Sequence, residues 1–516
     1  MKAIELKKIA LVAAVLCFQA NDLQAFAEEA AVSKPSTVSH GGYFRDVGKL
    51  KCKYNPGVFL VLQNGKILAL CGELSDAEEA IKAEDGKTYC HDIGMTELYD
   101  PATGETKLLT RMPFHSGGEE PRSHERQMQA VELKDGRVLL VGEFKESVRP
   151  LNYPEKTVIL PRESERTPYP GWPKVPLESI APRTEPQLFG IIYDWRTNEF
   201  ETVKTSDDIP PRHSAKLHVL SDGRVLVLGG AISMDRQWSW MTFPEKRVLV
   251  FDPKTKALSV AGELQKPRYG HEIVPVGDDK FLLLGGFGRS PKEFLASGIS
   301  DRTKEVELFD LASGESTLVG KLFSERSDFS AVLLPTGNVF ISGGPSHYGS
   351  RHTDWTGELF RPKDGKSSMT GWGAKSEDGR RTPLMPNDGM DSRSILIGST
   401  VLSAGSIAFK FEIEELENEL WPSGRRKGLL ELIMPRVDHE LVRDQRGRVF
   451  VIGGLSVGHV REGENFPKAD IIEEFTVEPT ASSMVSKVKL HSAYGWEFFG
   501  LKRRAFGSGG SIKPRN

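Results

Sequence analysis

Residues 222–230 read Asp222-Gly223-Arg224-Val225-Leu226-Val227-Leu228-Gly229-Gly230. A turn containing glycine opens this segment, four aliphatic residues follow, and a glycine pair closes it. Short aliphatic runs bounded by turn residues are typical of buried strands. The pattern returns six more times, with its first closing glycine (or Cys71 in its place) at positions 71, 142, 285, 343, 405 and 453. The chain is therefore built from repeats.

A second element follows most copies of this segment: an apolar strand that ends in an aromatic residue and a turn. Neighbouring copies lie 48 to 87 residues apart. A four-stranded propeller blade needs about 40–50 residues, so each unit is one blade plus a loop of variable length. The second element is seen at Tyr99-Asp100-Pro101, Tyr193-Asp194-Trp195, Phe251-Asp252-Pro253, Phe309-Asp310-Leu311 and Phe360-Arg361-Pro362.

The combination of apolar strand, glycine pair and aromatic-Asp-Pro turn resembles the kelch repeat, over residues 57 to 478. The sequence also departs from that family. The glycine pair is incomplete in copies one, two and six, and the tryptophan that usually follows the turn is replaced. The resemblance implies an all-β fold, a β-propeller of four-stranded antiparallel blades. Seven blades are expected, with six as the alternative. The replacements are Thr106, Phe200, Leu258 and Ser316.

The N-terminus has the features of an export signal. Lys2, Lys7 and Lys8 precede an apolar run from Ile9 to Phe18 that is too short to span a bilayer. Cleavage is expected after Ala27, which places the protein in the periplasm or outside the cell. The expected organisation is then a signal peptide (1–27), a linker that could supply a closing strand (28–50), the propeller (51–490) and a C-terminal tail whose composition predicts disorder (491–516). The closing strand comes either from 484–490 or from the segment before Cys52.

Composition limits the partners. The net charge is −3, which gives no reason to expect nucleic acid. No later apolar stretch is long enough for stable membrane insertion, and a monomer is expected. Three cysteines remain after processing, so at most one disulfide forms within the chain and one thiol is left over. The alternative is three buried thiols. The disulfide candidates are Cys52, Cys71 and Cys90.

Arginine recurs 17 residues before the first closing glycine, with histidine close behind. In kelch propellers the strand that follows this position is the innermost, so the resemblance implies basic side chains around the mouth of the central channel. Two interpretations compete: the arginines bind backbone carbonyls of the next blade, or they bind a ligand that bears carboxylates. The candidates are Arg122, His124, Arg212, His213, Arg268, His271, Arg326, Arg393, Arg436 and His439.

The same face should carry the long loops between the second and third strands of each blade. Residues 144–187 are rich in proline, which stiffens a loop and excludes helix. Two other loops contain residue types that dominate binding energy at interfaces. The alternative is that these aromatic residues form the core of their own loop. The contact candidates are Trp238, Trp240, His347, Tyr348, Arg351 and Trp355.

Whether the protein is an enzyme stays uncertain, and a non-enzyme is favoured. Nucleophile elbows, zinc helices, phosphate loops and the sialidase Asp-box are absent, and the context of the copper ligands of galactose oxidase is not found. No metal and no cofactor is expected. The predicted function is a binding scaffold for a protein or peptide ligand, with an acidic ligand favoured by the arginines. The alternative is a carbohydrate or sugar-acid binding protein or a mutarotase-like isomerase, whose ring opening needs only a modest acid/base pair.

Overall fold

The structure is a computed structural model and describes residues 42–477 with gaps at 55–57, 75–80, 90–92, 117–127, 147–187, 204–208, 234–241, 278, 289–301, 345–356, 371, 376–380, 384–392, 406–407, 414–415, 417–428, 431, 435, 438 and 457–469. The described residues belong to one compact unit. The secondary structure of its described part is almost entirely antiparallel strand, because alternating aliphatic residues and glycine-rich turns favour hairpins.

Each glycine-closed segment is the second strand of an antiparallel sheet, and we name the sheets blades 1 to 7 in the order of their repeats. Within a blade the strands are called A to D, from the innermost outward. The first four blades are β2 (Val58–Val61), β3 (Ile67–Glu73), β6 (Ile93–Asp100) and β7 (Glu105–Arg111); β9 (Gln129–Glu132), β10 (Val138–Glu146), β11 (Leu188–Asp194) and β12 (Glu199–Val203); β13 (Lys216–Val219), β14 (Val225–Leu228), β17 (Arg247–Asp252) and β18 (Ala257–Glu263); β19 (Glu272–Pro275), β20 (Lys280–Leu284), β21 (Glu305–Asp310) and β22 (Glu315–Lys321).

The other three blades follow the same order. They are β23 (Phe329–Leu333), β24 (Val339–Gly343), β25 (Gly357–Arg361) and β26 (Lys366–Thr370); β29 (Arg393–Ile397), β30 (Thr400–Ala404), β31 (Ala408–Glu412) and β32 (Leu429–Leu430); β34 (Glu440–Arg443), β35 (Val449–Ile452), β37 (Ile471–Val477) and β1 (Gly42–Lys49). Six of these sheets have four strands each, which agrees with the alternative expectation of six blades. The sheet of the second repeat has the same four strands and adds β8 (Phe114–Ser116) as a fifth, so all seven repeats contribute a sheet.

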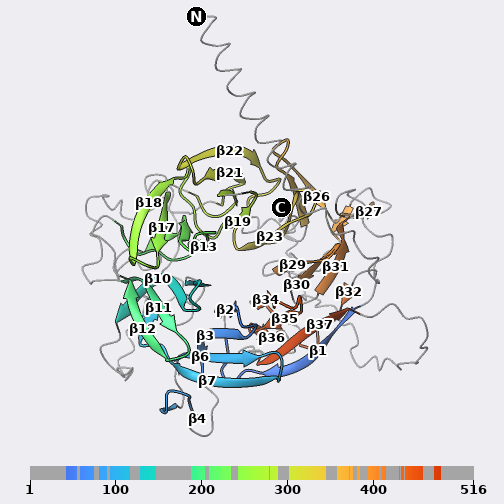
Figure 1. Cartoon of the computed structure of the whole chain (residues 1–516). Coiled ribbons are helices and arrows are strands. Elements are labelled where there is room, and N and C mark those ends of the chain that lie inside the picture. The colour runs from blue at the N-terminus through green and yellow to red at the C-terminus, as the bar shows by residue number, and fades with distance from the viewer. Residues whose placement is uncertain are drawn as a thin grey trace, which may run out of the picture. The chain divides into compact units, whose positions relative to one another are not determined.

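The blades are arranged around one axis (Figure 1). Neighbouring A strands contact one another from β34 through β2 and β9 to β13, and from β19 through β23 and β29 back to β34. The ion pair between Lys216 and Glu272 joins β13 to β19 and completes the ring. The A strands thus line the centre, and each blade shields its faces against its two neighbours.

The hydrophobic core lies between the blades. In β10, Val138 and Leu140 pack against residues of blade 1 such as Leu68. The alternate residue Leu139 faces the other way and packs with Val225 of blade 3. Both faces of a B strand are therefore buried, which explains why these strands are continuously aliphatic rather than alternating.

The glycine pair lets neighbouring blades approach closely. Gly229 has φ +60° and Gly230 has φ +99°, both in the left-handed region that favours glycine. A Cβ at Gly229 would lie 2.8 Å from the ring of His271 in the next blade, and one at Gly230 would lie 2.9 Å from the carbonyl of His213 in its own blade. The first glycine thus accommodates the neighbour, and the second accommodates the segment before strand A.

The N-terminal strand closes the ring. Of the two alternatives for the closing strand, the segment before Cys52 supplies it: β1 pairs with β37 in antiparallel register, with Phe44 opposite Phe475. Their ring centroids are 5.3 Å apart, and Arg45 forms a 2.8 Å ion pair with Glu474. Residues 484–490 lie outside the described part of the chain.

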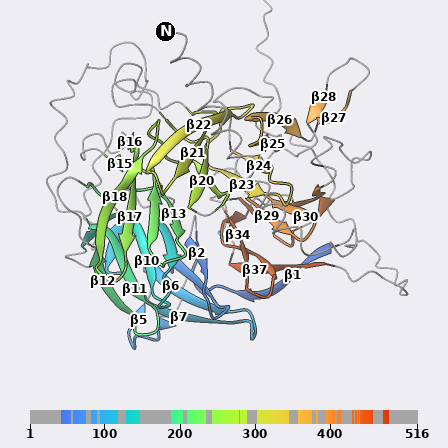
Figure 2. The same ribbon diagram turned by 45° about the horizontal axis from the view of Figure 1, so that its top comes forward.

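Additional paired strands occur in the connections between strands B and C and before strand A. Figure 2 shows two of these pairs at the upper edge of the ring in that view. They are β4 (Ile81–Lys82) with β5 (Thr88–Tyr89), β15 (Ala231–Ser233) with β16 (Thr242–Pro244), β27 (Trp372–Lys375) with β28 (Arg381–Pro383), and β33 (Arg436–Val437) with β36 (Leu455–Ser456). One of them, β4–β5, lies beside the outermost strand β7.

Candidate functional site

The recurrent arginines lie inside the blades. Arg268 is fully buried, and its guanidinium donates to the backbone carbonyls of Gly285 (3.0 Å) and Glu305 (3.2 Å) and to the carboxylate of Glu307. Glu307, on strand C of the same blade, is fully buried as well. It also accepts hydrogen bonds from the backbone N–H groups of Gln265 (2.8 Å) and Lys266 (3.2 Å). One carboxylate thus ties the segment before strand A to strand C.

The same unit occurs in blades 5 and 7. Arg326 donates to Glu358 (3.0 Å) and to the Gly343 carbonyl (2.8 Å). Arg436 donates to Glu473 (2.5 Å) and to the carbonyls of Gly453 (3.2 Å) and Ile471 (2.9 Å). All four charged side chains of these two pairs are fully buried. Repetition of the same contacts in three blades indicates a structural device of the repeat.

Blade 3 keeps the arginine but lacks the strand-C carboxylate, because Leu249 occupies that position. The Arg212 guanidinium instead donates to the Arg247 carbonyl (2.8 Å) and lies 3.6 Å from the carboxylate of Glu245, which sits before strand C. Burial lowers the pKa of Arg212 to about 10, against the opposing effect of Glu245. This blade shows that leucine can occupy the position of the buried glutamate.

These contacts correct the expectation of an arginine ring exposed at the channel mouth. Arg212, Arg268, Arg326 and Arg436 are fully buried, and their guanidiniums bind carbonyls of their own blade rather than of the next one. Moving a buried guanidinium away from these partners toward a ligand is costly. The contacts support the structural interpretation of the motif.

Blade 1 uses a tyrosine in place of the arginine. Tyr54 lies 17 residues before Cys71, is fully buried, and donates its hydroxyl to Glu97 (3.1 Å). Its backbone carbonyl accepts from Gly454 of blade 7, as the carbonyl of Arg268 accepts from Gly230. Burial raises the pKa of Tyr54, and the Glu97 carboxylate adds to this effect. The 17-residue spacing could have identified Tyr54, although a search for arginine misses it.

The three described histidines of the motif are also buried. His213 directly follows Arg212, whereas His271 and His439 lie three residues after their arginines. Burial lowers the pKa of His271 well below its usual range, and the cations of Arg268 and Lys216 add to this effect. Burial, Arg393 and Arg436 lower the pKa of His439 to about 3. Both imidazoles are neutral at physiological pH.

Charged side chains at the channel mouth come from the first residues of the A strands. Lys216 Nζ lies 2.7 Å from Glu272 Oε1, between blades 3 and 4. Arg393 Nε lies 3.3 Å from Glu440 Oε1, between blades 6 and 7. All four side chains are between 23 and 37% exposed. Arg393 is thus the described arginine candidate that stays partly exposed, at the first position of an innermost strand, and Lys216, Glu272 and Glu440 were missed by the arginine spacing.

Two of the cysteines are free thiols, so Cys52 and Cys71 do not form a disulfide with each other. Cys52 is fully buried, and burial raises the pKa of its thiol. The Cys71 sulfur lies 3.6 Å from that of Met112. This corrects the disulfide expectation for this pair and supports the alternative of buried thiols for Cys52. Cys90 lies outside the described residues.

Several predicted contact residues also lie outside the described residues, as does the segment interpreted as a signal peptide. Within the described ranges, no group of three potential metal ligands is found. The same ranges hold no helix long and apolar enough to cross a membrane. The contact candidates outside the description are Arg122, His124, Trp238, Trp240, His347, Tyr348, Arg351 and Trp355.

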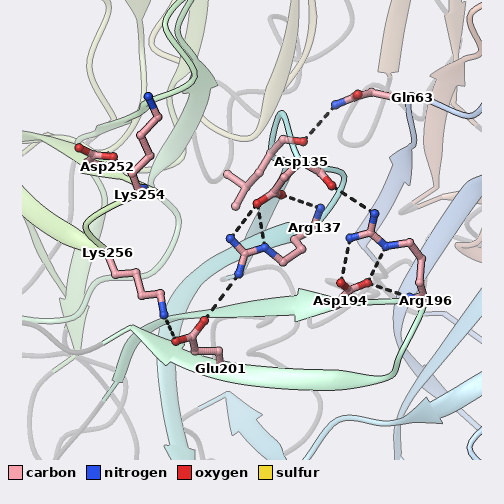
Figure 3. Close-up of polar contacts among 10 residues, drawn as sticks. Gln63, Asp135, Arg137, Asp194, Arg196, Glu201, Asp252, Lys254 and Lys256 are labelled. Atoms are coloured by element: carbon pink, nitrogen blue, oxygen red, sulfur yellow. Dashed lines mark hydrogen bonds and ion pairs between the residues drawn. The ribbon is translucent and has the colours of Figure 1, made fainter.

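The opposite face of the ring is formed by tight turns whose charges are paired. Figure 3 shows Arg137 between Asp135 (2.7 Å) and Glu201 (3.6 Å), with Lys256 of blade 3 bound to the same Glu201. Gln63 of blade 1 donates to a backbone carbonyl of blade 2. Ion pairs between exposed groups contribute only about 0–1 kcal/mol each. We interpret these contacts as structural links between neighbouring turns.

The ring of radially arranged antiparallel sheets defines the class of the protein: it is a β-propeller. No family model and no curated protein matches its sequence. Among solved structures, one described as "Structure of YjhT" is 13% identical, with 83% of this chain and 96% of that chain covered and a TM-score of 0.41. The assignment to the propeller class rests on the sheets of the chain itself.

Proposed function

We propose that this propeller is a kelch-type binding scaffold that works outside the cytoplasm and binds a protein or peptide ligand over the mouth of its channel. The observation that carries this proposal is the difference between the two faces. Strands A–B and C–D are joined by tight turns, as between Asp310 and Glu315, except for the connection between β31 and β32 and for blade 7, whose strands C and D are far apart in the sequence. The ends of strand B and the starts of strands C and A lie at the other face, where the extra pairs β15–β16 and β33–β36 also lie. Binding residues concentrate on the connections at such a face when a rigid scaffold positions them.

Export fits the position of the closing strand. Cleavage after Ala27 would remove the basic and apolar start of the chain but leave β1, which begins at Gly42, intact. The mature protein would therefore keep the strand that closes its ring.

The charges of the described channel mouth change the expected ligand. With the four arginines buried, Lys216 and Arg393 are balanced by Glu272 and Glu440 at the mouth. These residues give no excess positive charge there. A protein or peptide ligand therefore remains the proposed partner, but it need not be acidic.

A matched pair of labelled variants tests which face binds. Asp328 is an exposed residue just before β23, and Asp222 is an exposed residue in a turn on the opposite face; each is replaced by cysteine. Each variant is coupled to a bulky polymer, and binding of peptides selected on the wild-type protein from a phage-displayed heptapeptide library is measured. We expect the label at position 328 to weaken binding about tenfold or more, and the label at 222 to have less than about a twofold effect.

Two results would count against the proposal. Equal effects of the two labels would contradict binding at this face. Failure to select any peptide would contradict a peptide as the ligand. Wild-type protein treated with the same reagent controls for labelling of the native cysteines.

The second candidate is a sugar-acid ligand or an isomerase. It is favoured by the buried, neutral His271, which directly precedes the partly exposed Glu272 in the sequence, since an imidazole and a carboxylate can serve as an acid/base pair. A glycan array that includes acidic sugars separates this candidate from the first.

A further inference from the structure

The position three residues after the buried arginine packs against the first closing glycine of the preceding blade. In blade 5 this residue is Phe329, whose ring lies 2.8 Å from where a Cβ on Gly285 would be. In blade 4 it is His271, whose ring lies 2.8 Å from the corresponding point on Gly229. Blade 3 has Ala215 at this position. Apolar residues can therefore fill this place, and packing alone does not require histidine.

A buried imidazole has two ring nitrogens that need hydrogen-bond partners, whereas a buried phenylalanine ring has none. Neither ring nitrogen of His271 has a hydrogen-bond partner among the described residues, and the side chain is fully buried. Leaving a buried polar group without a partner is unfavourable, so such groups point to bound water or to a functional role.

Histidine takes this position in two blades, and both times it has the same neighbours. His271 is followed by Glu272 and lies close enough to Lys216 of the preceding blade for that cation to lower its pKa. His439 is followed by Glu440 and has the same relation to Arg393 of its preceding blade. We call these two groups the channel clusters: Lys216, His271 and Glu272, and Arg393, His439 and Glu440.

The channel clusters differ from the other described A strands. At the equivalent position of strand A, which pairs with the residue before the first closing glycine, the remaining blades have Val58, Gln129 and Ser330, none of which is charged. The two clusters lie on opposite sides of the ring, one between β13 and β19 and the other between β29 and β34 (Figure 1). Each combines a cation, a carboxylate and a neutral imidazole, and each carries no net charge.

We propose that the two channel clusters form a two-part site for a peptide segment that carries both a basic and an acidic side chain. This inference rests on the proposed function. Ligand carboxylates pair with Lys216 or Arg393, and ligand ammonium or guanidinium groups pair with Glu272 or Glu440. The buried imidazole that precedes each glutamate in the sequence offers one donor and one acceptor, which bind the ligand through water. A ligand of one sign would leave half of the mouth charges unpaired.

The test separates a binding role from a structural one. In the double variant with His271→Phe and His439→Phe, phenylalanine takes a position that Phe329 already fills in blade 5. We expect the thermal midpoint to stay equal to or above that of wild type, whereas affinity for library-selected heptapeptides falls about tenfold. Loss of stability without a change in affinity would overturn the proposal.

The charge requirement is tested with the same selected peptides. We expect enriched sequences to contain both a basic and an acidic residue, and binding to be lost in Lys216→Met with Arg393→Met. The control variant, Arg137→Met with Arg224→Met on the opposite face, should bind normally. Peptides that bind this channel variant as tightly as wild type would overturn the two-part site but leave the proposed function standing. Failure to enrich any peptide would overturn both.

Discussion

Glu473→Ala is expected to destabilise the protein by about 3–5 kcal/mol, which is a large part of the stability of a typical domain. The substitution leaves the fully buried guanidinium of Arg436 without its carboxylate. It also removes the acceptor of two backbone N–H groups, those of Ile433 and Met434. Chemical denaturation with urea measures the change, and Glu307→Ala in blade 4 should behave alike.

Two controls distinguish the buried pair from an ordinary ion pair. Glu263→Ala removes an exposed partner of Lys246 and should cost no more than about 1 kcal/mol. Replacing both members of the buried pair, Arg436→Met with Glu473→Leu, should cost far less than Glu473→Ala alone, since Leu249 already occupies the corresponding place in blade 3. An equal loss in the single and double variants would show that the two charges do not act as a pair.

Deleting residues 42–49 is expected to have the largest effect on stability. It would expose the edge of β37 and uncover the buried Phe475 and Ile472. An unpaired apolar edge is a template for association with another chain. We expect no cooperatively folded monomer, measured by thermal unfolding together with size-exclusion chromatography. Addition of a synthetic peptide of residues 42–50 should restore part of the monomer, because a strand added in trans can re-form the pairing.

The control deletes residues 28–41 and keeps β1. That variant should unfold at the temperature of the protein that begins at residue 28. A monomer that lacks 42–49 and unfolds at the same temperature would contradict the closing role of β1.

The sequence was sufficient to predict the propeller class because each repeat carries its own local signals. Aliphatic runs closed by glycine occur where strands are buried on both faces and where neighbouring backbones meet, as at Gly229. The sequence also encodes the closing strand, although the repeat spacing alone does not choose between residues 484–490 and the segment before Cys52. Val47-Gly48-Lys49-Leu50 has the same four residues as Val319-Gly320-Lys321-Leu322, at the end of the outermost strand of blade 4. Recognition of that repeat would have identified β1.

The burial of the arginines could not be read from their spacing. A recurrent arginine before strand A suits both an exposed ring and an internal tie, because spacing gives the position of a residue but not the direction of its side chain. The partner carboxylates were visible as charges inside apolar strands, two residues before the aromatic residue of strand C. These are Glu97, Glu307, Glu358 and Glu473.

The closed ring is tested most directly by a disulfide between its two ends. Arg45 and Glu474 are opposite each other in the β1–β37 register, at a separation suited to a disulfide bond. In the variant with Arg45→Cys and Glu474→Cys, mass spectrometry of the oxidised monomer should find a bond between positions 45 and 474 within one chain. The single variants should remain free of this bond. Bonds only between chains, or none at all, would contradict a propeller closed by its N-terminal strand.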